Sequence, residues 1–181
     1  QAHQLIRKED GWMGAKPHHH LINVTVSGSW WRGLPDEWGI PHTTMRDGAP
    51  NGYTILNFSD NNKPDIVFKA ARGPEEFQMS VFAPDSVELK AVNETWVYVN
   101  VFNGWDDSVV QVRWNNDGIW QTLDKTLEKD PNHQAVFDRE PETLPAPYTR
   151  ISAPVESRHL WKGTLNPEIG VGIHVLQVRA T

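Results

Sequence analysis

The sequence of 181 residues contains no cysteine. This absence excludes disulfide bonds, thiolate nucleophiles and zinc sites built from cysteine. A basic surplus is also missing, because 17 Lys and Arg stand against 23 Asp and Glu, a formal net charge of −6. The longest strictly apolar run, Trp96-Val97-Tyr98-Val99, is far shorter than the roughly 20 residues of a membrane helix. We therefore expect neither a nucleic-acid partner nor a membrane span.

The familiar catalytic motifs are absent as well. The chain has no Gly-x-Ser-x-Gly, no glycine-rich phosphate loop and no His-Glu-x-x-His. No signal-peptide pattern opens it, and a start at Gln1 without Met indicates a piece of a longer protein. We expect no complete catalytic site and no cofactor within these residues.

Strand-like alternation of apolar and polar residues dominates what is present. It is clearest at residues 97–102, 110–114 and 176–180, and further strands are predicted at residues 21–26, 53–58, 65–70, 77–82 and 119–122. Turn sequences separate them, at Asp47-Gly48, Asn51-Gly52, Asn103-Gly104 and Asn116-Asp117-Gly118. The pattern predicts an all-β fold, an antiparallel β-sandwich of immunoglobulin or fibronectin type.

One short helix is predicted at residues 132–139. Asp130 is a favourable N-cap and Pro131 a favourable first helical residue. Because Pro141, Pro145 and Pro147 follow, we expect an extended, proline-rich loop from there to about Pro154.

The most conspicuous candidate site is the run Pro17-His18-His19-His20. In an extended chain His18 and His20 share a face while His19 points away. Two such imidazoles can ligate a metal or serve in acid–base catalysis. The alternative is an ordinary polar strand, or histidines that pack against a neighbouring domain.

Nine tryptophans form the second unusual feature. Trp30 and Trp31 lie in Ser27-Gly28-Ser29-Trp30-Trp31-Arg32-Gly33, where paired indoles can stack on a sugar or a base, or fill a core and an interface. Strand contexts predict that four tryptophans belong to the core, and loop contexts predict that three are exposed. The first group is Trp96, Trp114, Trp120 and Trp161; the second is Trp12, Trp38 and Trp105.

These strings together resemble the C-terminal region of a bacterial calcineurin-like phosphoesterase family. The resemblance runs over essentially the whole chain, through Lys16-Pro17-His18-His19-His20, Ser27–Gly33, Gly39-Ile40-Pro41, Asp47-Gly48-Ala49-Pro50-Asn51-Gly52-Tyr53, His159-Leu160-Trp161-Lys162-Gly163 and Gly172-Ile173-His174-Val175. The resemblance implies a small N-terminal β domain, a two-metal phosphoesterase domain and a C-terminal β-sandwich in series. Ala2-His3-Gln4 lacks the family's Gly-His-x-His ligand motif, so His3 is not equated with a ligand.

The resemblance implies a division of the chain. Residues 1–28 would be the closing strands of the upstream phosphoesterase domain, and residues 29–181 the β-sandwich, ending shortly before the family's usual last strand. The parent protein would hold two divalent ions (Mn, Fe or Zn) and hydrolyse a phosphate ester, in the periplasm or outside the cell. Without the catalytic domain, residues 1 to about 20 are expected to be poorly ordered, domain-swapped or docked on another copy.

The function predicted from these observations is that of a non-catalytic accessory domain. It would pack on the phosphoesterase domain and shape the mouth of its active site. His18 and His20 would lie near the substrate, and the candidate interface residues are Trp30, Trp31, Arg32, Asp47 and Asn51. The alternatives are a carbohydrate-binding module that uses exposed tryptophans such as Trp38 and Trp105, and a passive spacer.

Overall fold

The computed structural model describes residues 1–58, 64–115, 119–143, 148–165 and 170–181. The predicted turn at Asn116-Asp117-Gly118, and Pro145 and Pro147 of the predicted loop, lie outside these ranges. The strands are β1 (Ala2–Ile6), β2 (His18–Ile22), β3 (Arg32–Pro35), β4 (Pro41–His42), β5 (Gly52–Phe58), β6 (Pro64–Ala70), β7 (Met79–Phe82), β8 (Trp96–Val101), β9 (Val110–Trp114), β10 (Gln121–Thr122), β11 (Asp124–Lys129), β12 (Glu156–Thr164) and β13 (Leu176–Ala180). The helices are α1 (Pro131–Thr143) and two short 3-10 turns, η1 (Lys8–Asp10) and η2 (Leu89–Glu94).

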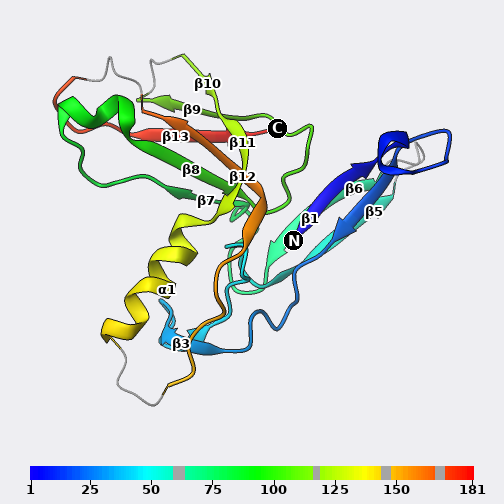
Figure 1. Cartoon of the computed structure of the whole chain (residues 1–181), viewed down its shortest axis with the longest axis horizontal. Helices are drawn as coiled ribbons and strands as arrows, with labels where there is room; N and C mark the ends of the chain where they lie inside the picture. Colours follow the sequence, from blue (N-terminus) through cyan, green and yellow to red (C-terminus); the bar gives the residue numbers. More distant parts are fainter. Residues whose placement is uncertain (59–63, 116–118, 144–147, 166–169) are drawn as a thin grey trace.

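Two antiparallel sheets form the body of the chain (Figure 1). The larger has the order β11-β12-β8-β7 and the smaller has the order β10-β9-β13. The register places Trp161 opposite Val99 in the first sheet and Val178 opposite Val112 in the second. The arrangement is sandwich-like and confirms the predicted all-β class. The likeness to immunoglobulin or fibronectin domains stays a prediction.

The main core draws on both sheets, since the alternating residues of their strands are buried together. It contains Val92, Val97, Val99, Val101, Val110, Val112, Leu123, Trp161 and Leu165. A second cluster closes the base of the β5–β6 hairpin with Val24, Ala49, Phe68, Ala70 and Phe102. The predicted core faces of β8 and β9 are thereby confirmed, although Asn100 on the other face of β8 is buried as well.

The tryptophan predictions are confirmed only in part. Trp161 is fully buried in the core, and Trp114 packs against it. Trp96 is exposed, because it begins strand β8, where Lys162 rather than the second sheet lies over its ring. Trp120 is partly buried beneath the guanidinium groups of Arg113 and Arg179. The strand context therefore predicted correctly that these indoles lie in strands or beside them. It did not predict whether each indole is buried.

Helix α1 begins as predicted and ends later than predicted. Asp130 caps it, because Oδ1 of Asp130 accepts the backbone N–H of His133 at 2.8 Å. The expectation that Pro141 starts an extended loop is wrong, since the helix continues through Pro141 to Thr143. A proline there leaves the carbonyl of Phe137 without its helical donor, and Arg150 donates to that carbonyl instead.

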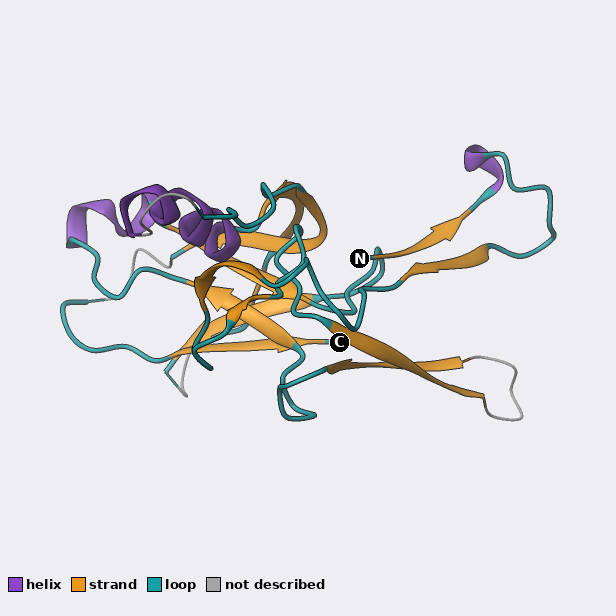
Figure 2. Ribbon diagram, turned by 90° about the horizontal axis from the view of Figure 1, so that it is seen from below, coloured by secondary structure: helices purple, strands orange, loops and turns teal. Residues whose placement is uncertain are grey.

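Two hairpin arms, β1–β2 and β5–β6, project from the same side of the body (Figures 1 and 2). Each is an isolated two-stranded antiparallel sheet, as is the short pair β3–β4. The strands β1, β3, β4 and β11 were missed from the sequence, and β12 was predicted only through the strand context of Trp161. Residues 23–26 do not continue the predicted strand beyond Ile22. The expectation of disorder or swapping for residues 1 to about 20 differs from the structure, where β1 pairs with β2 of the same chain.

Candidate functional site

The histidine run lies on the β1–β2 arm. His18 and His20 share one face of β2, as predicted. The His18 ring stacks on Trp12, with ring centroids 4.7 Å apart, and Nδ1 of His20 lies 3.1 Å from Nε2 of Gln4. Neither contact supplies the carboxylate that would orient an imidazole for acid–base chemistry. Within this chain the two histidines are accessible side chains on an arm.

The other face of the same arm is anchored to the body. His3 stacks on Trp105 with centroids 5.0 Å apart, and its Nε2 lies 3.5 Å from Nδ1 of His19. Burial, followed by the neighbouring His19, lowers the pKa of His3, so its ring is neutral near pH 7. Trp105, predicted to be exposed, is instead partly covered by these rings and is not a free stacking platform.

Trp30 and Trp31 lie on a bend that precedes β3. Both have positive φ angles, 70° and 48°, which are rare for bulky residues. Because neither residue has an extended backbone, the alternation of faces along a strand does not apply to this pair. Trp30 is 76% exposed, whereas the Trp31 ring lies 5.5 Å from the guanidinium carbon of Arg72. Arg32 begins β3 opposite His42.

Asn51 fixes the loop before β5 rather than facing a partner. It is buried, its Oδ1 accepts from Thr43 Oγ1 at 2.9 Å, and its Nδ2 donates to the carbonyl of Val26 at 2.7 Å. Gly28 packs against the same place, because a Cβ added there would lie 2.1 Å from the Thr43 carbonyl oxygen. These contacts explain the residue types in the Ser-Gly-Ser and Asn-Gly strings.

Asp47 belongs to a buried polar network at the centre of the chain. Its side chain is 8% exposed, and Oδ2 lies 3.2 Å from Nε2 of His159. Nδ1 of His159 lies 2.6 Å from Oδ1 of Asn100, and Nδ2 of Asn100 donates to Asp130 Oδ2 and to the Asp47 carbonyl. The network joins the 47–52 loop to β8, β12 and the start of α1.

The electrostatics of this network hold Asp47 in its ionised form. Burial raises the pKa of Asp47, but the hydrogen bond and charge of His159 outweigh it, with a further contribution from the Gln1 amino group. The resulting pKa is well below its usual range. Gly48 is required beside it, because its φ is +85° and an added Cβ would meet Asp130 Cγ at 2.3 Å.

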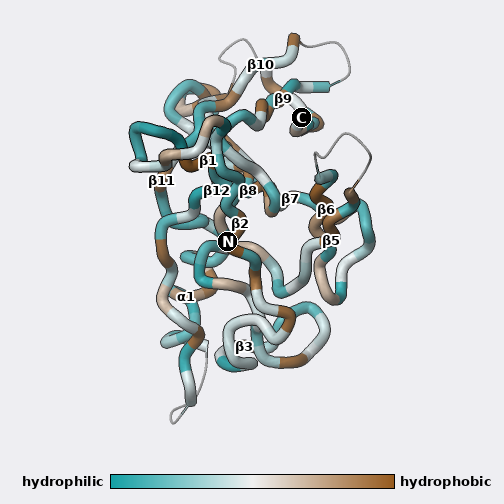
Figure 3. The backbone as a smooth tube through the Cα atoms, turned by 90° about the vertical axis from the view of Figure 1, so that its right-hand side faces the viewer, coloured by the Kyte–Doolittle hydropathy of each residue, from teal (hydrophilic) through white to brown (hydrophobic). Residues whose placement is uncertain are grey.

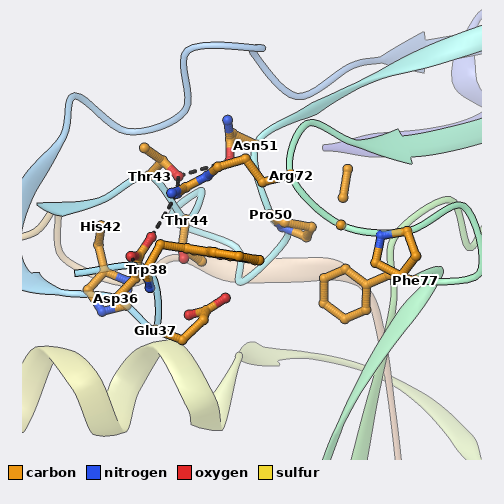
Figure 4. A pocket seen from close by; sticks show the side chains of 13 residues that line it. Asp36, Glu37, Trp38, His42, Thr43, Thr44, Pro50, Asn51, Arg72 and Phe77 are labelled. Atoms are coloured by element: carbon orange, nitrogen blue, oxygen red, sulfur yellow. Dashed lines mark hydrogen bonds and ion pairs between the residues drawn. The ribbon is translucent and has the colours of Figure 1, made fainter. Parts of the chain in front are cut away.

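A pocket of about 330 Å³ opens beside this loop (Figure 4). Its residues come from the ends of β3, β4 and β6 and from the segments that follow β6 and precede β5: Asp36, Glu37, Trp38, His42, Thr43, Thr44, Pro50, Asn51, Ala70, Arg72, Gly73, Pro74 and Phe77. An adjoining cavity of about 260 Å³ extends towards α1 and shares five lining residues with this pocket: Glu37, His42, Thr44, Pro50 and Phe77. Of the candidate residues, Asn51 lines this pocket, and Trp31 contacts Arg72, which lines it.

The polar wall of the pocket is a fixed network. Nη2 of Arg72 donates to Oδ2 of Asp36 at 2.7 Å and to Oγ1 of Thr43 at 3.0 Å. Figure 4 shows these contacts, together with the bond from Thr43 to Asn51. Burial raises the pKa of Asp36, but the N–H of Trp38, Arg72 and the N–H of Ile40 lower it below its usual range. Asp36 is therefore ionised at neutral pH.

His42 contributes no positive charge to the pocket at neutral pH. Burial lowers the pKa of His42 more strongly than the nearby Asp36, Glu37 and Glu140 raise it, and His133 lowers it further. The charged groups of the pocket are therefore Asp36, Glu37 and Arg72. Their sum is one negative charge.

The described residues do not form a metal site. No group of three or more histidine, aspartate or glutamate side chains in them is arranged to hold an ion. The two divalent ions that the resemblance implies do not fit this part of the chain and would need ligands outside it. Nor does any helix in the described ranges have the length and apolar character needed to cross a membrane.

The fold and the pocket define a class, a sandwich-like β module with projecting arms and a polar pocket. The family described as the C terminal of calcineurin-like phosphoesterase matches residues 20–181. The chain belongs to this family, and the resemblance seen in its motifs is confirmed. No curated protein and no solved structure matches the chain.

Several important residues were not found from the sequence. Asp36 and Arg72 are 36 residues apart, and Asn100 and His159 are 59 apart, so no local motif joins either pair. Glu140 is fully buried where it accepts the N–H groups of Leu34 and Ile151 at 2.9 and 3.0 Å. The string Asp36-Glu37-Trp38-Gly39 was a local signal for a turn. An aspartate side chain commonly accepts a hydrogen bond from the backbone two residues further on, and glycine is favoured where the chain turns.

Proposed function

We propose that this chain is the non-catalytic C-terminal module of a metal-dependent phosphoesterase. Its two arms pack on the catalytic domain that precedes it and shape the mouth of the active site. The observation that carries this proposal is the pair of projecting hairpins with exposed apolar side chains. Membership of the phosphoesterase C-terminal family supports the identity of the partner domain.

The β5–β6 arm has apolar side chains on both faces. The register pairs Leu56 with Ile66 on one face and Ile55 with Val67 on the other. Leu56 and Ile55 are exposed, and Phe58 is 75% exposed. Figure 3 shows hydrophobic residues along this arm. An isolated hairpin is marginally stable, and contiguous exposed apolar surface marks an interaction site, so a partner surface accounts for this arm.

The β1–β2 arm supplies the second contact. Its strands pair only with each other among the described residues, so their outer edges are free to add to another sheet. Ile22 is exposed at the end of the arm near the body, and His18 lies exposed at the other end. Docking of this arm would bring His18 and His20 to the rim of the active site, where an imidazole binds a phosphoryl oxygen or protonates the leaving group.

The test compares the full-length protein with the 181-residue chain. We expect Leu56→Asp combined with Phe58→Asp to leave the melting temperature of the 181-residue chain nearly unchanged, since both side chains are exposed. In the full-length protein the same pair lowers the melting temperature and exposes the domain junction to limited proteolysis. Ile119→Asp is the control, because Ile119 is exposed on the loop before β10. An undisturbed full-length protein would overturn the proposal in favour of a passive spacer.

The role of the histidines is tested separately. His18→Ala with His20→Ala should lower kcat of the full-length enzyme on an aryl phosphate without lowering its melting temperature. His174→Ala is the control, because His174 contacts Asn115 on the body instead. Equal kcat in all three proteins would contradict the substrate-proximal role and leave the docking proposal standing.

A further inference from the structure

The loop at residues 36–40 holds an aromatic side chain outward in a fixed position. Oδ1 of Asp36 accepts the N–H of Trp38 at 2.9 Å and that of Ile40 at 3.4 Å, while the backbone N–H of Asp36 donates to Ile40. Gly39 completes the turn with φ of +75°. Trp38 is nevertheless 60% exposed and borders the pocket. An exposed indole on such a preorganised loop is a stacking surface whose ordering cost has already been met within the fold.

The pocket beside Trp38 contains polar atoms that the chain does not satisfy. Nη1 of Arg72 is buried and has no hydrogen-bond partner among the described residues. Oγ of Ser80, in the adjoining cavity, is buried and unpartnered as well. Buried polar groups without partners are unfavourable, so two of them in connected cavities indicate a hydrogen-bonding occupant. Figure 4 shows the Trp38 indole edge-on, extending into the pocket on the side of Phe77.

The charge of the pocket restricts what that occupant can be. Arg72 is already paired with Asp36, and Glu37 adds a second carboxylate, so a phosphate or another anion meets net negative charge. Aromatic surfaces at Trp38 and Phe77 favour a ligand with an apolar face, and the unpaired donors favour hydroxyl groups. A volume of about 330 Å³ lies within the size range of small-molecule pockets.

We infer that the pocket between Trp38, Arg72 and Phe77, together with the adjoining cavity lined by Ser80, binds a neutral saccharide. A sugar ring stacks on Trp38, and hydroxyl groups are hydrogen-bonded to Arg72 and Ser80. This site lies on the body and does not depend on the docking of the arms. It gives the C-terminal module a means of holding the enzyme at a glycan-bearing surface or substrate.

The test is an NMR titration of the 181-residue chain with cellobiose, maltose and N,N′-diacetylchitobiose, with the tryptophan indole N–H signals followed. We expect saturable shifts of the Trp38 signal with at least one of these sugars. Trp38→Ala should weaken the binding roughly two- to tenfold, because the contribution of one aromatic stacking contact converts to factors in this range. Trp12→Ala, which removes an indole on the β1–β2 arm, should leave affinity unchanged.

Two further measurements separate the saccharide from other occupants. Ser80→Ala should keep or raise the melting temperature, because its hydroxyl has no partner among the described residues, and should weaken sugar binding severalfold. Glucose 6-phosphate should bind more weakly than glucose. If none of the sugars shifts the Trp38 signal, or if glucose 6-phosphate binds more tightly than glucose, the inference is wrong.

Discussion

In the body of the chain the apolar side chains of the strands face a second layer, whereas in the two arms many of them face away from the protein. Val99 and Val110 are completely buried in the body, while Ile55 and Phe58 on the β5–β6 arm are exposed. Both regions are built from antiparallel strands. The difference lies in what covers them, because the arms have no second sheet in the described chain. We therefore expect the body to be stable by itself, whereas under the proposed function the arms are covered by the catalytic domain.

The largest loss in the free energy of unfolding is expected when the buried polar network around Asp47 is broken. Asp47→Ala removes the carboxylate that contacts Nε2 of His159 and leaves only the contact of that ring with Asn100. Breaking a buried pair by removing one partner costs about 3–5 kcal/mol, so we expect a loss of this order in the free energy of unfolding. Urea denaturation measures it.

The matched control is Asp106→Ala, which removes an exposed carboxylate paired with Lys125 at 2.7 Å. A surface pair contributes about 0–1 kcal/mol. Equal losses for the two variants would show that burial of the Asp47 network does not distinguish it from a surface ion pair.

A smaller loss of folding stability is expected when the pH is lowered. Because the folded chain lowers the pKa of Asp47 and Asp36 below the ordinary value of 3.8, it binds fewer protons than the unfolded chain in that range. The stability that these groups contribute is fully present above about pH 5 and is lost as the pH falls through their folded pKa values.

Urea unfolding of the wild-type chain between pH 7 and pH 2 should show this loss. Asp47→Ala should show a shallower dependence on pH, whereas Asp106→Ala should keep the wild-type slope. If the free energy of unfolding of Asp47→Ala depends on pH as steeply as that of the wild type, Asp47 does not cause the loss of stability in acid.

The smallest effect is expected at the junction between body and arm. Trp105→Ala removes the ring on which His3 stacks, and aromatic pairs contribute about 0.5–1.5 kcal/mol beyond their buried area. Hydrogen exchange should quicken at the amides of β1 and β2, while β8 and β12 keep their protection. Uniformly faster exchange would mean that this arm and the body form one cooperative unit.

Particular residues show how far the sequence alone could be read. Asp130 and Pro131 predicted the start of α1 correctly, because a capping residue and a first-turn proline act locally. The end of the helix was missed, because the helix continues through Pro141. The carbonyl of Phe137, which Pro141 leaves without a helical donor, accepts a hydrogen bond from Arg150 outside the helix. The extent of strand β12 was not predicted beyond the strand context of Trp161, because its buried positions include polar Ser157 and His159, which break the apolar alternation.

By itself the sequence determined the all-β class, most strand positions, the shared face of His18 and His20, and the family. These depend on period-2 patterns, short-range backbone preferences and contiguous strings. The tertiary structure alone decided that Asp47 meets His159, that Arg72 joins Asp36 beside Trp38, and that Trp105 is covered by His3. Each of these contacts joins segments far apart in the chain. Burial and pairing at such distances are set by the packing of whole elements, which no local pattern encodes.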